Sequence, residues 1–509
     1  MSAIQHIPSS RKSVVPFGTM GVAIVCFWVI MMCLLVFKNN FHKNFYRTEY
    51  TDINKQKKGG MKAPDETWME IYLQDAKVGY SQNRIQPLDG GYLAYESLYL
   101  RLNLMGRPSL VQTETQSALD EELRLKNFHF SMRSGTTTFS VRGEIKDRWM
   151  IIRQKGSPER KIRLEGPLYT GASFTYLFKN ASLAVGKSLS IPFFDPSTLT
   201  RNTMVLTVTE KETIRIYDIP YRTFRLETDL MGQHLFFWVN EDGDLLKERG
   251  LMGMQLVRSN ASRATEDLSE GGGNDYYQLA AVGSDRKLGH PRDLRFLKVR
   301  LQGIAETPFK VSALNGGRQR YEKGILEIRR EQLPPVGSLN LSRMILPSDA
   351  RACLEPELNV ESNDPEIRRM AKAIGDREQD PVLVAEKLLR WVFLNIDKRP
   401  VLTIPSAREV LKTRVGDCNE HAALLTALLR ASSIPARVCA GLVYAKGKFF
   451  YHAWTECWLG KWISMDATLN QMPADATHIA LIRGNLEKQA GIIALMGKVK
   501  VEVLDYKYD

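Results

Sequence analysis

The sequence predicts an α+β protein in which one membrane-spanning helix and a large antiparallel β region precede a domain of mixed helices and strands. Three observations predict this class. A 21-residue apolar run lies near the amino terminus, residues 64–268 alternate between apolar and polar positions, and after Pro347 the hydrophobic period lengthens to about 3.6 residues. We therefore expect strands to dominate the first half of the chain and helices to gather in the second.

Length and composition narrow the class further. The chain has 509 residues, of which 44% are hydrophobic and 25% charged, and this balance excludes disordered, collagen-like and polytopic membrane proteins. The net charge of +13 fits solubility, an anionic membrane surface or nucleic acid about equally well, so charge alone names no partner. The six cysteines have no close C-x-x-C spacing, which excludes a disulfide-rich scaffold and a structural zinc pattern.

The apolar run covers residues 17–37 and contains no charged residue. A helix of this length reaches about 30 Å, which matches the core of a bilayer. We interpret it as an uncleaved anchor with the lipid bilayer as its partner, rather than a signal sequence or a buried helix, because no small-residue cleavage site follows it. A tail at residues 1–16 precedes it and a basic tether at residues 38–63 follows. The positive charges of the tether favour a cytoplasmic carboxyl side, whereas the short tail argues for the opposite side.

The β-rich domain at residues 64–268 consists of short alternating runs separated by turn residues. Seven of these runs are expected to be strands, at residues 68–72, 91–104, 139–143, 149–153, 204–208, 214–217 and 235–239. Residues 193–196 are interpreted as a loop that also contributes to the core. We find no metal or nucleophile constellation in this domain and expect it to act as a spacer, a substrate-presenting unit or a lipid-facing unit.

A glycine-rich break at residues 269–274 separates this domain from a smaller β-rich region at residues 276–350, which we interpret as a small sandwich. Three helix starts are then expected in the domain at residues 351–509. An aspartate followed by proline begins two of them, at Asp364 and Asp380, and a Ser-x-x-Glu capping box at Ser406 begins the third.

The most informative residue for chemistry is Cys418. A glycine turn at Gly416 delivers it to the first turn of an apolar helix that continues to Arg430. Free backbone N–H groups and the helix dipole stabilise a thiolate at such a position, so we expect Cys418 to be the most reactive thiol of the soluble part. Taken alone, the position also fits a small buried hydrophobe.

Three strands are expected after this helix, and they carry a histidine and an aspartate. If Ala445 opposes Lys448 in the first hairpin, His452 lies opposite Gly441, which would leave space above the imidazole. The same register points Cys439 and Cys457 to opposite faces, so these two should not form a disulfide. A three-residue turn at residues 459–461 then places Asp466 diagonal to His452, at about 7–8 Å between backbones.

Cys418, His452 and Asp466 together are the parts of a Cys-His-Asp triad. His452 would keep Cys418 as a thiolate and later protonate a leaving amine, and Asp466 would fix the imidazole tautomer. The backbone N–H of Cys418 and one further, unidentified donor would hold the oxyanion. Asn419 and Trp391 are candidates for that donor, although each residue fits helix surface or core as well.

Residues 351–470 resemble the transglutaminase-like superfamily of bacterial proteins. The resemblance rests on three blocks in order: Gly-Asp-Cys at 416–418 with its helix, His-Ala-Trp-Thr-Glu at 452–456, and Trp462 followed by Asp-Ala-Thr at 466–468, where proline is common in place of Ala467. It implies a papain-like transglutaminase core in a membrane-anchored protein. It also implies transamidation, proteolysis or deamidation of protein or peptide amides by the triad, and it favours an extracytoplasmic, periplasmic location.

Other interpretations stay beside this one. The chain could instead be a non-catalytic binding or assembly module that retains the fold. Nucleic acid is not expected as a partner, and neither a cofactor nor a metal is indicated, since no D-x-D-x-D-G loop occurs. Among residues near the triad, we expect His421 to be a polar neighbour, Trp454 and Glu456 to support the site, and Arg437 to donate a structural ion pair.

Overall fold

The structure is a computed structural model. It describes residues 65–508 except 105–106, 136, 231–232, 251–252, 269–279, 305–308, 344, 402–403 and 485. The transmembrane helix expected at residues 17–37, its preceding tail and the tether therefore lie outside the described residues. Within the described part of the chain, no helix is both long and apolar enough to cross a membrane.

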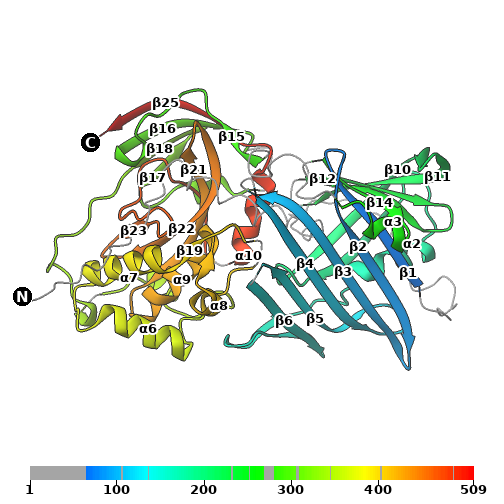
Figure 1. Cartoon of the computed structure of the whole chain (residues 1–509), viewed down its shortest axis with the longest axis horizontal. Helices are drawn as coiled ribbons and strands as arrows, with labels where there is room; N and C mark the ends of the chain where they lie inside the picture. The colour runs from blue at the N-terminus through cyan, green and yellow to red at the C-terminus, as the bar shows by residue number, and fades with distance from the viewer. Residues whose placement is uncertain are drawn as a thin grey trace, which may run out of the picture.

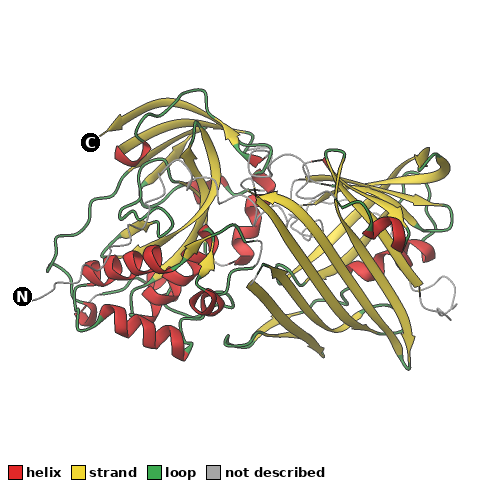
Figure 2. Ribbon diagram, in the orientation of Figure 1, coloured by secondary structure: helices red, strands yellow, loops and turns green. Residues whose placement is uncertain are grey.

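The first half of the chain forms one 14-stranded antiparallel sheet, the large twisted body of strands in Figures 1 and 2. Neighbouring strands follow one another in sequence, and β1 and β14 join the two halves of the sheet. Its strands and the helices around them are β1 (Asp65–Leu73), β2 (Ala76–Leu88), β3 (Gly91–Leu104), β4 (Arg107–Leu119), β5 (Leu125–Ser134), β6 (Thr137–Lys146), β7 (Trp149–Arg153), β8 (Arg160–Arg163), α2 (Gly171–Asn180), β9 (Ser188–Asp195), β10 (Thr200–Ile216), β11 (Ile219–Leu230), β12 (Gln233–Asn240), β13 (Leu245–Arg249), β14 (Met254–Ser259) and α3 (Ala261–Thr265).

The large sheet curls around helix α2. Strands β5 and β9 lie far apart in the order of the sheet, yet the rings of Phe128 and Phe194 are 5.1 Å apart. Phe174 of α2 packs against Phe193 of β9 with ring centroids at 5.8 Å. The inner face of the sheet and one face of α2 therefore share a hydrophobic core.

Six of the seven strands expected in this region lie within strands of the structure, and the one expected at residues 214–217 ends one residue beyond β10. Alternating patterns and glycine turns determine short antiparallel strands well. One expectation was wrong. Residues 193–195 belong to β9 rather than to a loop, and they pair with β10 up to Asp195. They do contribute to the core, since Phe193 and Phe194 are buried.

The second β region is also different from the expected small sandwich. Residues 294–329 supply three strands of a single four-stranded sheet, in the order β17-β18-β16-β25, whose fourth strand comes from the carboxyl end of the chain. These strands are β16 (Leu294–Gln302), β17 (Gln319–Glu322), β18 (Ile325–Arg329) and β25 (Lys500–Tyr508). Pairing across about 200 residues has no local sequence signal, so the pattern could not reveal it.

The remaining elements build the domain that carries the expected triad, on the left of Figure 1. They are β15 (Val282–Gly283), α5 (Ser348–Ala352), α6 (Pro365–Gly375), α7 (Pro381–Asn395), β19 (Asp397–Lys398), α8 (Ala407–Thr413), β20 (Val415–Gly416), α9 (Cys418–Ala431), β21 (Ala436–Ala445), β22 (Lys448–Trp458), β23 (Trp462–Met465), β24 (Ile479–Arg483) and α10 (Leu486–Gln489). The three expected helix starts are confirmed, with Asp364, Asp380 and Ser406 as the N-caps of α6, α7 and α8.

Helix α9 is the centre of this domain. Its side chains are buried from Cys418 to Arg430, because α6, α7 and α8 pack around it on one side and the sheet β15-β22-β21-β24 lies on the other. Thr455 of β22 donates a hydrogen bond to the Ala422 carbonyl of α9 at 3.2 Å and lies 3.2 Å from the Thr426 hydroxyl. These contacts fix the start of α9 against the middle of β22.

Candidate active site

Cys418 is the first residue of α9, and the residues around it form a tight helix start. Asp417 is the N-cap, and its side-chain Oδ1 accepts the Asn419 N–H at 2.9 Å. Glu420 in turn accepts the Asp417 N–H at 3.0 Å, which completes a capping box. A Cβ atom at Gly416 would lie 2.2 Å from Cβ of Glu420, so only glycine fits there.

His452 lies on β22 opposite Gly441 of β21, and this expected register is confirmed. The expected reason for the glycine was wrong. A Cβ atom at Gly441 would lie 1.9 Å from the carbonyl oxygen of Ile479, so the glycine makes room for β24 rather than for the imidazole. Cys439 and Cys457 are both free thiols, as the register predicted.

Asp466 follows β23, whose hairpin with β22 has the expected three-residue turn between Trp458 and Trp462. One carboxylate oxygen of Asp466, Oδ2, lies 2.5 Å from Nε2 of His452. The other oxygen accepts the backbone N–H groups of Thr468 and Leu469 at 2.7 and 2.9 Å. Burial alone would raise the pKa of Asp466, but its two imidazole neighbours hold the pKa well below its usual range, so the group is a carboxylate.

The orientation of the His452 ring follows from this hydrogen bond. A carboxylate only accepts, so Nε2 of His452 carries the proton and Nδ1 is the basic nitrogen. Nδ1 is buried and has no hydrogen-bond partner among the described residues. It is therefore the nitrogen that remains for exchange of a proton with a thiol.

His478 is a second histidine of the site that the sequence analysis missed. Its Nε2 donates to the same Asp466 oxygen at 3.0 Å, and its Nδ1 lies 3.2 Å from Asp475. Burial would lower the pKa of His478, but the carboxylates of Asp475 and Asp466 raise it to about 9, so the imidazole is protonated at neutral pH. The Asp-x-x-His spacing from 475 to 478 is the local signal that could have indicated it.

The ligand atoms of His452, Asp466 and His478 all lie within 4.8 Å of one another, close enough in principle to share a metal ion. They are also joined directly by the two hydrogen bonds described above. The sequence indicated no metal. Two imidazoles and one carboxylate can bind a metal ion, but they can equally well transfer and hold protons.

Two other charged or titratable side chains lie near the aspartate. Lys398 of β19 donates to the Phe393 carbonyl at 2.9 Å, and burial lowers its pKa. His421 is fully buried and bonds through Nδ1 to the Asp417 carbonyl at 2.6 Å. Burial lowers the pKa of His421 to about 4, so the ring is neutral. His421 is thus a polar neighbour inside the domain, as expected.

The expectation of a stable thiolate at Cys418 is not met in this conformation. The side chain is fully buried, and burial together with the neighbouring Asp417 carboxyl raises the thiol pKa well above its usual range. A hydrogen bond from the Ala453 backbone N–H acts in the opposite direction but does not outweigh burial. The helix start stabilises an anion only when solvent or substrate replaces the apolar cover.

The remaining candidates have structural partners. Arg437 forms the expected ion pair with Glu456 at 2.7 Å, and Trp454 lies beside His452 with ring centroids at 6.0 Å. Of the two candidates for the oxyanion donor, the Asn419 side chain donates to Asp417 at 3.3 Å and Trp391 packs against the Arg414 guanidinium. Neither geometry assigns the oxyanion role.

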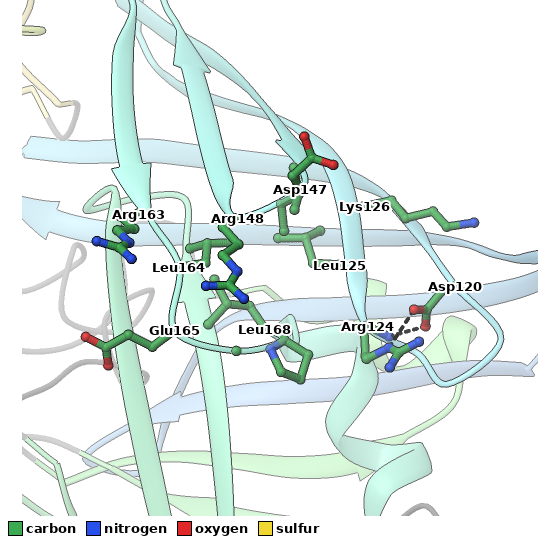
Figure 3. A pocket seen from close by; sticks show the side chains of 13 residues that line it. Asp120, Arg124, Leu125, Lys126, Asp147, Arg148, Arg163, Leu164, Glu165 and Leu168 are labelled. Atoms are coloured by element: carbon green, nitrogen blue, oxygen red, sulfur yellow. Dashed lines mark hydrogen bonds and ion pairs between the residues drawn. The ribbon is translucent and has the colours of Figure 1, made fainter.

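A wide cavity of about 800 Å³ is found elsewhere, on the β-rich half of the chain (Figure 3). Its lining includes the Arg124–Asp120 ion pair at 2.6 Å and the exposed arginines Arg148 and Arg163. None of the expected triad residues lines it. Its size alone does not make it the reactive site, because it brings together no nucleophile and base.

Comparison with known proteins gives the following matches. A candidate cysteine protease from Cytophaga hutchinsonii is 17% identical, with a TM-score of 0.28, and the match covers 42% of this chain and 86% of that one. A β-barrel-like protein of unknown function from Brucella abortus is 10% identical, with a TM-score of 0.32, and the match covers 40% of this chain and 98% of that one. TM-scores this low support no structural inference.

No curated protein matches. Residues 368–467, which contain Cys418, His452 and Asp466, match the transglutaminase-like superfamily, and the chain therefore carries a domain of that superfamily.

Proposed function

We propose that the protein is a thiol acyl-transfer enzyme that acts on protein or peptide amides through Cys418, His452 and Asp466. The observation that carries the proposal is the 2.5 Å hydrogen bond between His452 and Asp466, which leaves Nδ1 of His452 as the free base in the domain whose central helix begins at Cys418. The hydrogen bond from the Ala453 backbone N–H to the Cys418 sulfur supports the proposal, because Ala453 follows His452 on β22.

The reaction follows from these roles. Nδ1 of His452 takes the proton of the Cys418 thiol as the sulfur attacks the amide carbonyl. The carbon–nitrogen bond then breaks, and His452 returns the proton to the leaving amine, which leaves an acyl thioester on Cys418. Attack by water gives hydrolysis, whereas attack by a second amine gives transamidation, and either restores the thiol. Asp466 stays ionised and stabilises the imidazolium.

Burial of the site adds a requirement. Cys418, His452 and Asp466 are all fully buried, so an amide can reach the sulfur only after covering side chains move. A neutral thiol in the closed conformation also protects the sulfur from oxidation, because the thiolate is the reactive form. Substrate binding would therefore both open the site and permit proton transfer to His452.

The alternative function is a binding or assembly module without turnover. The complete burial of the three side chains and the raised pKa of Cys418 favour it.

We also propose that residues 17–37 anchor the protein in a membrane and that the remaining domains are extracytoplasmic. Both candidate functions are compatible with this location. Alkaline phosphatase fused after residue 509 tests the location, because its disulfides form only outside the cytoplasm, and an expressed but inactive fusion would contradict it.

The decisive experiment incubates the full chain with peptides that contain glutamine, with and without a biotinylated alkylamine. Amine incorporation indicates transamidation, shortened peptides indicate proteolysis, and released ammonia indicates deamidation. Cys418→Ala should abolish every product, whereas Cys457→Ala, which removes another fully buried thiol of the same domain, should not. Activity that persists in Cys418→Ala would overturn the proposal, and no product with any peptide would favour the binding module.

A further inference from the structure

A second cavity of about 200 Å³ lies inside the curled sheet, between its inner face and helix α2. It is distinct from the open cavity in Figure 3. Aromatic rings form much of its wall, among them Phe128 of β5, Phe174 of α2, Phe193 of β9 and Phe237 of β12. Most of the cavity wall therefore comes from the strands of the sheet and from helix α2.

One side chain in this wall contradicts the usual rule for buried charges. Glu248 of β13 is only 5% exposed and lines the cavity. Its carboxyl has no hydrogen bond or ion pair with any residue that the structure describes, and burial alone raises its pKa to about 7. A carboxyl buried without a partner is destabilising in an apolar setting, so a purely structural role does not explain it.

Other polar atoms of the wall are also unsatisfied. Oδ1 of Asn83 and Oγ of Ser117 are buried and lack hydrogen-bond partners among the described residues. The two other acids of the wall have partners: Glu96 accepts the Ala172 N–H at the start of α2, and Asp195 accepts bonds from Ser197 and Thr198 at 2.6 and 2.7 Å. Glu248 is thus the acid of this wall that is left for a ligand.

The charge of the wall indicates the sign of that ligand. Its described residues include the three acids Glu96, Asp195 and Glu248 but no lysine, arginine or histidine. The negative faces of phenylalanine rings also attract cations. A carboxylate or phosphate would meet three acids and no cation here, whereas an ammonium group would find a carboxylate, an amide oxygen and aromatic faces.

We propose that this cavity is a binding site for a small organic amine, whose ammonium group pairs with Glu248 and whose apolar group fills the space between the phenylalanine rings. The size is consistent, since apolar cavities of about 150 Å³ in proteins hold benzene. The proposal concerns the β-rich half and does not depend on acyl transfer at Cys418.

The test uses benzylamine as the probe, with benzyl alcohol and benzoate as neutral and anionic compounds of similar shape. Binding to the full chain is measured by titration calorimetry and by the rise of the melting temperature, in amphipol, because detergent tails could enter an apolar cavity. We expect benzylamine to bind at least tenfold more tightly than either control compound. Glu248→Gln should weaken benzylamine at least tenfold but leave benzyl alcohol unchanged.

Glu114→Gln is the matched control, because Glu114 lies on β4 with an exposed side chain and does not line the cavity. It should bind like the unmodified protein. Equal binding of benzylamine and benzyl alcohol would overturn the proposal, as would binding of none of the compounds, which would indicate water alone in the cavity. Unchanged benzylamine binding in a folded Glu248→Gln protein would also overturn it. If that variant does not fold, the preference of the unmodified protein for benzylamine over benzyl alcohol and benzoate still tests the proposal.

Discussion

His452 and His478 share one hydrogen-bond acceptor, the Oδ2 atom of Asp466, at 2.5 and 3.0 Å. Because the pKa of His478 is raised to about 9, the second histidine is a cation beside the carboxylate that orients the first. Asp466 therefore divides its charge between two imidazoles. We propose that His478 is a positioning residue, which acts on His452 through Asp466.

His478→Gln should lower the rate of acyl transfer and change its pH dependence. Loss of the 3.0 Å bond lets Asp466 shift, and a misplacement of about 1 Å can cost about 100-fold in rate. Because His478 loses its proton near pH 9, the rate of the unmodified protein should fall as pH rises through 9, and this basic limb should be absent from His478→Gln. The profile is measured with the amine-incorporation assay. A slower His478→Gln enzyme that keeps the basic limb would contradict the electrostatic part of this role.

The same histidine should make the stability of the protein depend on pH. The pKa of His478 is about 9 in the folded protein and about 6.5 in an unfolded chain. Its contribution is thus complete below pH 6.5 and is lost as pH rises through 9, and the difference corresponds to about 3 kcal/mol of unfolding free energy. Urea unfolding at pH 6 and pH 9.5 should show this loss in the unmodified protein.

The control for that measurement is a second histidine variant. His129 lies half-buried on β5, and its ring contacts the Ser140 hydroxyl at 2.9 Å. His129→Gln should retain the full loss of stability between the two pH values, whereas His478→Gln should show a smaller loss. Equal losses in the two variants would mean that other groups, such as Glu361 with its pKa raised to about 7, cause the effect.

Alkylation should distinguish Cys353 from the triad cysteine. Cys353 is the partly exposed thiol among the four described, whereas Cys418, Cys439 and Cys457 are buried. With iodoacetamide at pH 7.5 we expect Cys353 to react first and Cys418 to react only when the site opens, which reverses the order expected from the sequence. Mass spectrometry of the labelled peptides measures this, with Cys353→Ser as the control. Fast labelling of Cys418 without substrate would mean that the closed conformation is not the main one in solution.

The sequence predicted the local part of the site well. A two-residue turn after Ala445 and a three-residue turn after Trp458 determine the register of three consecutive strands, and the register brings His452 to Asp466. The helix that begins at Cys418 was equally predictable, because glycine, an N-cap aspartate and an apolar run are all local signals.

The rest of the site depends on contacts that no local pattern contains. His478 reaches Asp466 because β24 pairs with β21, which precedes it by more than 30 residues, and the segment between Asp466 and β24 is irregular. Lys398 lies in a strand of only two residues. The raised pKa of Cys418 results from burial by several helices, and burial of a helix start cannot be inferred from the helix alone.

Gly441→Ala should damage the site without touching a triad residue. The added Cβ would lie 1.9 Å from the Ile479 carbonyl oxygen, and backbone cannot yield as a flexible side chain can, so β24 must move away from β21. His478 precedes β24 directly and should move with it. We expect a loss of about 1–3 kcal/mol in unfolding free energy, together with a smaller dependence of stability on pH, because His478 loses its carboxylate partners.

Gly283→Ala is the matched control, since Gly283 lies on β15 of the same sheet and a Cβ there meets no atom within 4 Å. If Gly441→Ala lowers stability equally at pH 6 and pH 9.5, the close approach of β24 to Gly441 does not hold His478 in place.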